Sequence, residues 1–129
     1  MKTNPISTFA LSLLTIGWLA LAGTASAAQS LVVTTLVDEN NGTSNPGFGT
    51  GTSLREAMQW ANIDGVDSEI TFSPTVFAAP RKTITLNYGG LPLPVFDPNG
   101  TATITAPAAG VEISGNNASR VFQVAWGPA

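Results

Sequence analysis

The chain of 129 residues contains neither cysteine nor histidine. Without cysteine there can be no disulfide, no thiolate nucleophile and no lipid-carrying cysteine of a bacterial lipoprotein. Without either residue, Ser-His and Cys-His catalytic arrangements and the usual zinc sites are excluded. We therefore predict no catalytic residue, no cofactor and no metal ligand, and we expect the chain not to be an enzyme.

Basic residues are also scarce. The sequence has five Lys and Arg against eight Asp and Glu, for a formal net charge of −3. Nucleic-acid binding requires clustered Lys and Arg to neutralise phosphates, so this composition argues against a nucleic-acid partner. The one basic pair, Arg81-Lys82, is interpreted as a solvated turn.

The N-terminal residues predict export. Lys2 provides a positive start, residues 9–22 are mostly apolar, and Ala25-Ser26-Ala27 has the small residues of a cleavage site. This is the pattern of a Sec signal peptide over 1–27, and the apolar run is short for a membrane span. An uncleaved N-terminal anchor is the alternative. After cleavage, residues 28–129 would have no stable membrane span and would be secreted to the periplasm, the cell surface or the medium.

Beyond residue 30, Thr, Val, Ile, Gly, Asn and Pro dominate, which is typical of strands and tight turns. Residues 38–52 are rich in glycine and polar residues and predict an irregular loop. The turn spacing of roughly ten residues fits either a sandwich or barrel, or a β-helix of stacked coils, and local pattern leaves these open. The predicted strands are 31–37, 69–72, 83–87, 101–105, 111–114 and 121–125, with alternating Leu91, Leu93 and Val95 between prolines.

One helix is predicted, over residues 53–62. Ser53 and Glu56 have the spacing of a capping box, in which each side chain accepts a hydrogen bond from the other residue's backbone N–H. The helix has an apolar stripe that must dock on other elements, because so short a helix is marginal alone. The stripe consists of Leu54, Ala57, Met58 and Ala61, and Asn62 is a plausible stop residue.

Charged residues in this region have competing interpretations. Arg55 and Glu56 could form an exposed site, but the capping box accounts for Glu56, so we expect Arg55 to pair with a nearby carboxylate or carbonyl. Two acidic groups could bind calcium, yet they lack the spacing of an EF-hand and are interpreted as solvated turns. These groups are Asp64, Asp67 and Glu69, and Asp38 with Glu39. Gly47, Gly49 and Gly51 lack the Lys-Ser/Thr of a phosphate-binding loop and predict a flexible turn.

The segment Thr52-Ser53-Leu54-Arg55-Glu56-Ala57 resembles the CSLREA motif of large exported bacterial proteins. The similarity continues, in the order of that family, through Val33-Thr34-Thr35, Ile84-Thr85-Leu86 and 111–115. It implies a mainly β chain: an N-terminal cap with one short α-helix and the first coils of a right-handed parallel β-helix, occupying 28–129. Thr52 stands where the motif has Cys, so a role that needs a thiol is absent.

The resemblance also implies a function. The CSLREA family includes adhesin-like and polymorphic outer-membrane-like surface proteins, so we expect a non-catalytic surface module. Its ligand is unknown, and we expect a carbohydrate or a host or cell-surface protein. The alternative is the N-terminal part of a β-helix polysaccharide lyase or glycosidase, for which only Arg81, Lys82 and Arg120 could supply cations. Family members are much longer, so we expect a truncated solenoid or fragment, or else a small protein that pairs through its last coil. An open last coil would expose strand edges and favour self-association.

Overall fold

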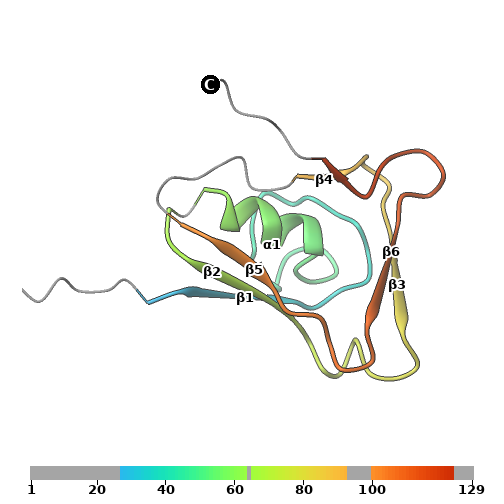
Figure 1. Cartoon of the computed structure of the whole chain (residues 1–129), viewed down its shortest axis with the longest axis horizontal. Helices are drawn as coiled ribbons and strands as arrows, with labels where there is room; N and C mark the ends of the chain where they lie inside the picture. Colours follow the sequence, from blue (N-terminus) through green and yellow to red (C-terminus); the bar gives the residue numbers. More distant parts are fainter. Residues whose placement is uncertain (1–26, 64, 93–99, 124–129) are drawn as a thin grey trace, which may run out of the picture.

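The computed structural model describes residues 27–63, 65–92 and 100–123. This part of the chain consists mainly of short strands with one short helix, which confirms a mainly β fold (Figure 1). The elements are β1 (Gln29–Val33), α1 (Leu54–Ala61), β2 (Ser68–Phe72), β3 (Lys82–Thr85), β4 (Leu91–Pro92), β5 (Ala102–Ile104), β6 (Val111–Ser114) and β7 (Phe122–Gln123).

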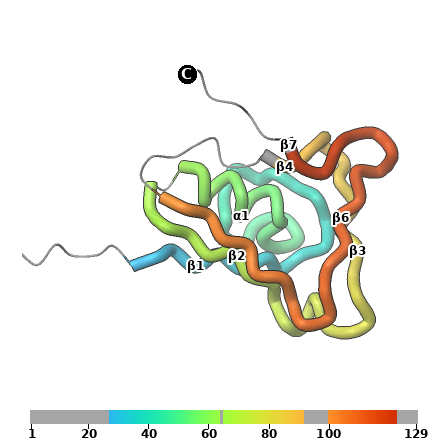
Figure 2. Tube along the Cα trace, in the orientation of Figure 1, coloured from blue at the N-terminus to red at the C-terminus, as the bar shows by residue number. Residues whose placement is uncertain are grey.

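The strands form three small sheets, and all of their pairings are parallel. The sheet orders are β1-β2-β5, β3-β6 and β4-β7. An isolated parallel bridge joins Val37, after β1, to Thr85 at the end of β3. Along the chain, β2, β3 and β4 therefore each belong to a different sheet. The next three strands, β5, β6 and β7, belong to the same three sheets in the same order. The sheets lie on three sides of a triangular outline (Figure 2).

The core is built from side chains that align across neighbouring strands. Leu31 pairs with Ile70, and Ile70 with Ile104, so the three side chains lie on one face of their sheet. Ile84 pairs with Ile113, and both belong to or pack against the same apolar cluster. The alternating pattern of each strand places its apolar side chains on one face, which points inward. β-Branched and leucine side chains on that face stack well in rows across neighbouring strands.

Helix α1 begins and ends where the sequence predicts. Ser53 is the N-cap and the full capping box with Glu56 is present, while Asn62 is the C-cap. The apolar stripe is buried: Leu54 and Met58 are each 1% exposed. The helix contacts β1, β2 and β4, and it therefore brings together strands of two sheets. None of the helices in 27–63, 65–92 and 100–123 is long and apolar enough to cross a membrane.

The strands predicted over 31–37 and 83–87 end earlier than predicted, and hydrogen bonds explain where they end. The strand predicted over 31–37 ends at Val33, because Thr34 N–H donates to the Thr52 carbonyl at 2.9 Å and the chain bends. The strand predicted over 83–87 ends at Thr85, although the Leu86 N–H still donates to the Ser114 carbonyl of β6 at 2.9 Å, because the N–H groups that follow leave the ladder. Those of Asn87 and Tyr88 donate to the Asp38 carboxylate instead.

The other predicted strands overlap the observed ones within the part of the chain that the structure describes. The strand predicted over 111–114 coincides with β6. Residues 38–52 contain neither helix nor strand, as predicted. The predictions of a signal peptide, of a turn at Asp64 and of alternation through Leu93 and Val95 fall almost entirely outside the described residues.

Candidate functional site

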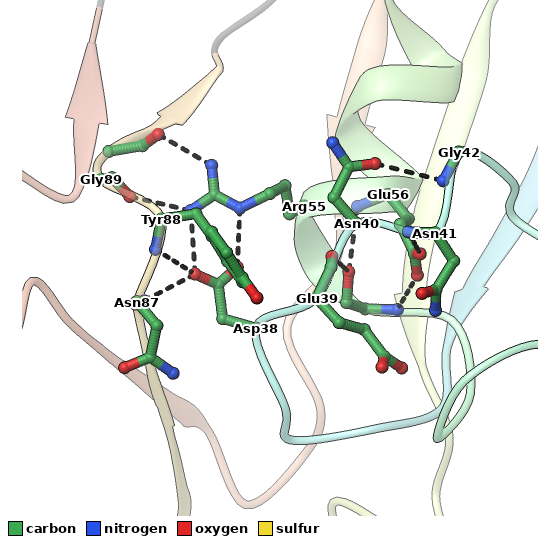
Figure 3. A network of polar contacts seen from close by, with 12 residues as sticks. Asp38, Glu39, Asn40, Asn41, Gly42, Arg55, Glu56, Asn87, Tyr88 and Gly89 are labelled. Carbon is green, nitrogen blue, oxygen red and sulfur yellow. Dashed lines mark hydrogen bonds and ion pairs between the residues drawn. The ribbon is translucent and has the colours of Figure 1, made fainter.

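The most concentrated group of charged and polar side chains lies between α1 and the segments that flank it (Figure 3). Asp38 comes from the loop after β1, and Arg55 and Glu56 come from the first turn of α1. All three are buried, with exposed fractions of 3%, 6% and 1%. Buried charges require partners, so each hydrogen bond of this group must be accounted for.

The Asp38 carboxylate is fully occupied. Its Oδ1 accepts from Arg55 Nε at 2.7 Å, and its Oδ2 accepts from Arg55 Nη2 at 2.9 Å, giving a two-point ion pair. Oδ2 also accepts from the backbone N–H groups of Asn87 at 2.7 Å and Tyr88 at 3.1 Å. A bidentate guanidinium–carboxylate pair is among the stronger charge-assisted contacts in proteins.

The remaining Arg55 donors bind the turn before β4. Nη2 donates to the Gly89 carbonyl at 2.8 Å, and Nη1 donates to the Gly90 carbonyl at 3.1 Å. The guanidinium therefore joins three segments that are distant in sequence: the loop after β1, the helix and the turn at residues 87–90. Four of its five N–H donors bind groups within the protein, which is the geometry of a structural link.

The environment of Asp38 favours its ionised form. Burial by itself opposes ionisation, but the hydrogen bonds from Arg55, Asn87 and Tyr88 and the positive charge of Arg55 outweigh it. The pKa of Asp38 is consequently lowered from its ordinary value. Asp38 is a stable carboxylate near neutral pH and is poorly suited to transfer a proton.

These contacts settle two interpretations made from sequence. The interpretation of Asp38 as a solvated turn residue is wrong, because the residue is buried and paired with Arg55. The expectation that Arg55 pairs with a carboxylate or a carbonyl is confirmed, and it binds both kinds of acceptor. Sequence reasoning missed the pairing of Asp38 with Arg55 because the two residues are 17 positions apart.

Both carboxylate oxygens of Glu56 also accept hydrogen bonds from within the protein. Its Oε2 accepts from Ser53 N–H at 2.9 Å, which is one half of the capping box, and its Oε1 accepts from Asn41 N–H at 2.6 Å. The other half of the capping box is the hydrogen bond from the Glu56 N–H to Ser53 Oγ, at 3.1 Å. The Ser53 hydroxyl in turn donates to the Glu39 carbonyl at 2.6 Å. The cap thus also fixes the loop of residues 39–41 against the helix.

The threonine at the cysteine position of the motif is buried too. Thr52 Oγ1 donates to the Ser44 carbonyl at 2.7 Å, and the Thr52 N–H donates to Thr34 Oγ1 at 2.8 Å. The hydroxyl and the N–H of Thr52 thus both bind loop residues next to the N-cap. Gly51 precedes it with φ of +138°, and a Cβ there would meet Thr34 Oγ1 at 2.7 Å. The close approach of the two segments at this point requires glycine.

The other acidic residues are engaged in backbone or strand contacts. Glu39 Oε1 accepts hydrogen bonds from the N–H and the hydroxyl of Thr50. Burial by itself raises the pKa of Glu39, but the hydrogen bonds outweigh burial and lower this pKa from its ordinary value. Asp67 Oδ1 accepts from Thr101 N–H at 2.9 Å, and both Asp67 and Glu69 are exposed. Asp64 is outside the described residues. In the described ranges, no three His, Cys, Asp or Glu residues gather as a metal site would require.

The basic residues lie apart from this network. Arg81 forms an exposed ion pair with Glu112, with 3.8 Å between Nη2 and Oε2. Lys82 begins β3, so the interpretation of Arg81-Lys82 as a turn is wrong for Lys82. Arg120 is exposed in the segment before β7. The structure does not bring these cations together with the buried carboxylates near α1.

The described part of the chain also forms two open depressions. One of about 350 Å³ lies at the end of α1 and is lined by Gly42, Gln59, Trp60, Asn62 and Ile63. The other, of about 610 Å³, has an apolar lining from 72–79 and 107–109. The rings of Phe72 and Phe77 form its floor in an edge-to-face contact, with centroids 4.9 Å apart. Neither lining contains a charged side chain.

The chain was compared with known proteins in three ways. No family profile, no curated protein and no solved structure matches it.

Proposed function

We propose that this chain is the capped start of a right-handed parallel β-helix and serves as a non-catalytic module of an exported bacterial surface protein. The observation that carries the proposal is the repeated path of the chain. The strands β2, β3 and β4 are followed by β5, β6 and β7 in the same three sheets, and every pairing is parallel. A solenoid of stacked coils has this topology.

The register supports coils of similar length. Ser68 of β2 pairs with Ala102 of β5, which is 34 positions later. Lys82 pairs with Val111, 29 positions later, and Leu91 pairs with Phe122, 31 positions later. The earlier step, from Gln29 to Ser68, is 39 positions because it contains the loop and α1. In this proposal α1 is the cap that covers the first coil.

The site chemistry favours a structural role for the acidic residues near α1. A general acid or base must have a free position for a substrate proton. The oxygens of Asp38 and Glu56 instead accept hydrogen bonds from within the protein. The lyase or glycosidase alternative depends on exposed cations, and Arg81 is engaged with Glu112. Among the described residues, no contact favours that alternative.

The resemblance to the CSLREA family supplies the surface and adhesin-like part of the proposal. Its ligand would be a carbohydrate or a cell-surface protein, bound on the outer faces of the coils. Export would follow from the signal peptide proposed for residues 1–27. N-terminal sequencing of protein recovered from outside the inner membrane tests this step: a chain that still begins with Met1 would contradict it.

Spin labels test the stacked coils. Ser30, Glu69 and Thr103 occupy one row across β1, β2 and β5, and all three are exposed. Because the natural chain lacks cysteine, the double variant Ser30→Cys/Thr103→Cys can be labelled at these positions alone. Strands two positions apart in a sheet are separated by about 9.5 Å, so electron paramagnetic resonance should report strong coupling. Weak coupling would contradict stacking.

Activity is tested separately. The purified chain should release no product from acidic or neutral polysaccharides, and it should bind one class of glycan or surface protein on an array. Turnover that is abolished by Arg81→Ala or Arg120→Ala would favour the lyase or glycosidase instead. The variant Val32→Ala, at an exposed position on β1, serves as a matched surface control.

A further inference from the structure

Asn41 is the one asparagine in residues 27–63, 65–92 and 100–123 that precedes a glycine. Asparagine is chemically labile because the backbone nitrogen of the next residue can attack its side-chain carbonyl carbon, and glycine, without a Cβ, hinders this attack least. Asn41 and Gly42 are both exposed, and a Cβ at Gly42 would meet nothing within 4 Å. The pair therefore has the composition and the access to water that deamidation requires.

The folded loop keeps the reacting atoms apart. A Cβ at Gly49 would collide with both the Asn41 amide nitrogen and Glu39 Oε2, so these two atoms lie side by side. The Asn41 amide donates a hydrogen bond to the Glu39 carboxylate. Figure 3 shows the Asn41 side chain turned to the side of Glu39 and away from the Gly42 nitrogen. Ring closure thus requires the Asn41 amide to leave Glu39.

The backbone on the two sides of the reacting bond is held unequally. The Asn41 N–H donates to Glu56 Oε1 at 2.6 Å, which joins this residue to the first turn of α1. The Gly42 N–H donates to Asn40 Oδ1 at 3.3 Å in an exposed setting, which is longer than an ordinary N–H···O bond. The attacking nitrogen is therefore weakly bound, and the docking of Asn41 on Glu39 and Glu56 is what prevents the reaction.

We propose that Asn41 is a site of spontaneous deamidation that reacts when its loop opens, and that the product prevents the loop from closing again. In the first step the Gly42 nitrogen bonds to Cγ of Asn41, the bond from Cγ to the amide nitrogen breaks, and ammonia leaves with the proton from Gly42. Water then opens the succinimide ring at either of its carbonyls. The chain is left with an aspartate or an isoaspartate at position 41, and no enzyme takes part.

Both products oppose the closed loop. An aspartate at position 41 replaces the amide donor with a carboxylate beside Glu39, and neighbouring carboxylates repel one another. An isoaspartate continues the backbone through Cγ, which adds a methylene before Gly42 and changes the path of the loop. In either case the loop of residues 39–41 is held to α1 less tightly, and the change is permanent because the ammonia is lost.

Peptide mapping by mass spectrometry, after incubation in mildly alkaline buffer, measures deamidation at position 41. The folded chain should react roughly tenfold more slowly than the chain in urea, since protection reports the free energy of opening the loop. Glu39→Ala should raise the rate in the folded chain, and Glu112→Ala, at an exposed carboxylate on β6, should not. Circular dichroism should show that both variants remain folded. Equal rates in buffer and in urea, or a rate that Glu39→Ala leaves unchanged, would overturn the proposal.

The variant Asn41→Asp reproduces the aspartate product directly. Carbon-13 NMR should show the pKa of Glu39 raised relative to that of the natural chain, and amide hydrogen exchange of residues 39–41 should accelerate. Asn45→Asp is the matched control in the same loop, because its Oδ1 accepts from the Gly47 N–H at 2.9 Å and an aspartate can still do so. It should change neither quantity. An Asn41→Asp variant with the natural Glu39 pKa and natural exchange rates would refute the effect on loop closure.

Discussion

Arg55 and Asp38 face one another across the junction between α1 and the loop after β1, and two hydrogen bonds of 2.7 and 2.9 Å join them. The same guanidinium reaches the carbonyls of Gly89 and Gly90. One side chain of the helix therefore connects the loop after β1 to the turn before β4. We consider this link central to the docking of α1.

Removal of Arg55 should be costly. Arg55→Met leaves the Asp38 carboxylate buried without its cation, and breaking a buried pair in this way lowers the free energy of unfolding by about 3–5 kcal/mol. Arg55→Lys should recover only part of the loss, because an ammonium cannot bind both oxygens and both carbonyls in the plane of a guanidinium. Urea denaturation followed by circular dichroism gives these values.

Arg81→Met is the matched control for the ion pair. Arg81 contacts Glu112 at 3.8 Å with both side chains mostly exposed, so its removal should change stability by less than about 1 kcal/mol. The double variant Asp38→Asn/Arg55→Met should be more stable than the sum of the two single losses predicts, because neither buried charge is then left alone. Strict additivity would show that the pair is not coupled.

The lowered pKa of Asp38 predicts a specific acid response. The unfolded chain, with an ordinary aspartate pKa of about 3.9, binds the proton more readily than the folded chain. The contribution of Asp38 to stability is thus complete above that value and is lost as the pH falls through the lower pKa of the folded state. Carbon-13 NMR of the Asp38 carboxyl group should give a midpoint below 3.9. A midpoint at or above the ordinary value would contradict the role of Arg55.

Local signals were sufficient to predict the helix. Ser53, Glu56 and Asn62 act within one or two turns, and the capping box and the C-cap occur as predicted. The strand at 111–114 was predicted by its own alternation in the same way. These features depend on neighbouring residues, so a single sequence contains the information that determines them.

The tertiary link could not be predicted in the same way. Asp38 follows a strand and precedes a polar loop, which locally resembles a solvated turn, and its partners are 17 to 50 positions away. The same long-range bonds end β3 at Thr85, two residues before its predicted end. Which strands pair with which also depends on contacts between residues about 29 to 39 positions apart. Sequence pattern alone therefore left the sandwich and the β-helix equally open.

Glu56 should stabilise the cap through its position and its two acceptor oxygens. Glu56→Ala leaves the N–H groups of Ser53 and Asn41 without their acceptor, and should lower the free energy of unfolding by about 1–3 kcal/mol. Glu56→Gln should be less damaging, since glutamine can accept one of these bonds in a capping box. Glu112→Ala, at an exposed carboxylate, is the control. Equal effects of the alanine and glutamine variants would contradict this account.

Leu54 tests whether α1 stabilises the sheets that it contacts. Its side chain is 1% exposed, and the helix contacts β1, β2 and β4. Leu54→Ala should cost about 2–5 kcal/mol through the cavity it leaves, and Leu54→Asp should cost more because a carboxylate would also have to be desolvated. Ile63→Asp, at a side chain that is 69% exposed just beyond the helix, should have little effect. A melting temperature that Leu54→Asp leaves unchanged would show that α1 does not stabilise the sheets. If instead the far-ultraviolet signal of the strands is lost together with that of the helix, the helix and the sheets unfold as one unit, as the buried contacts of Leu54 require.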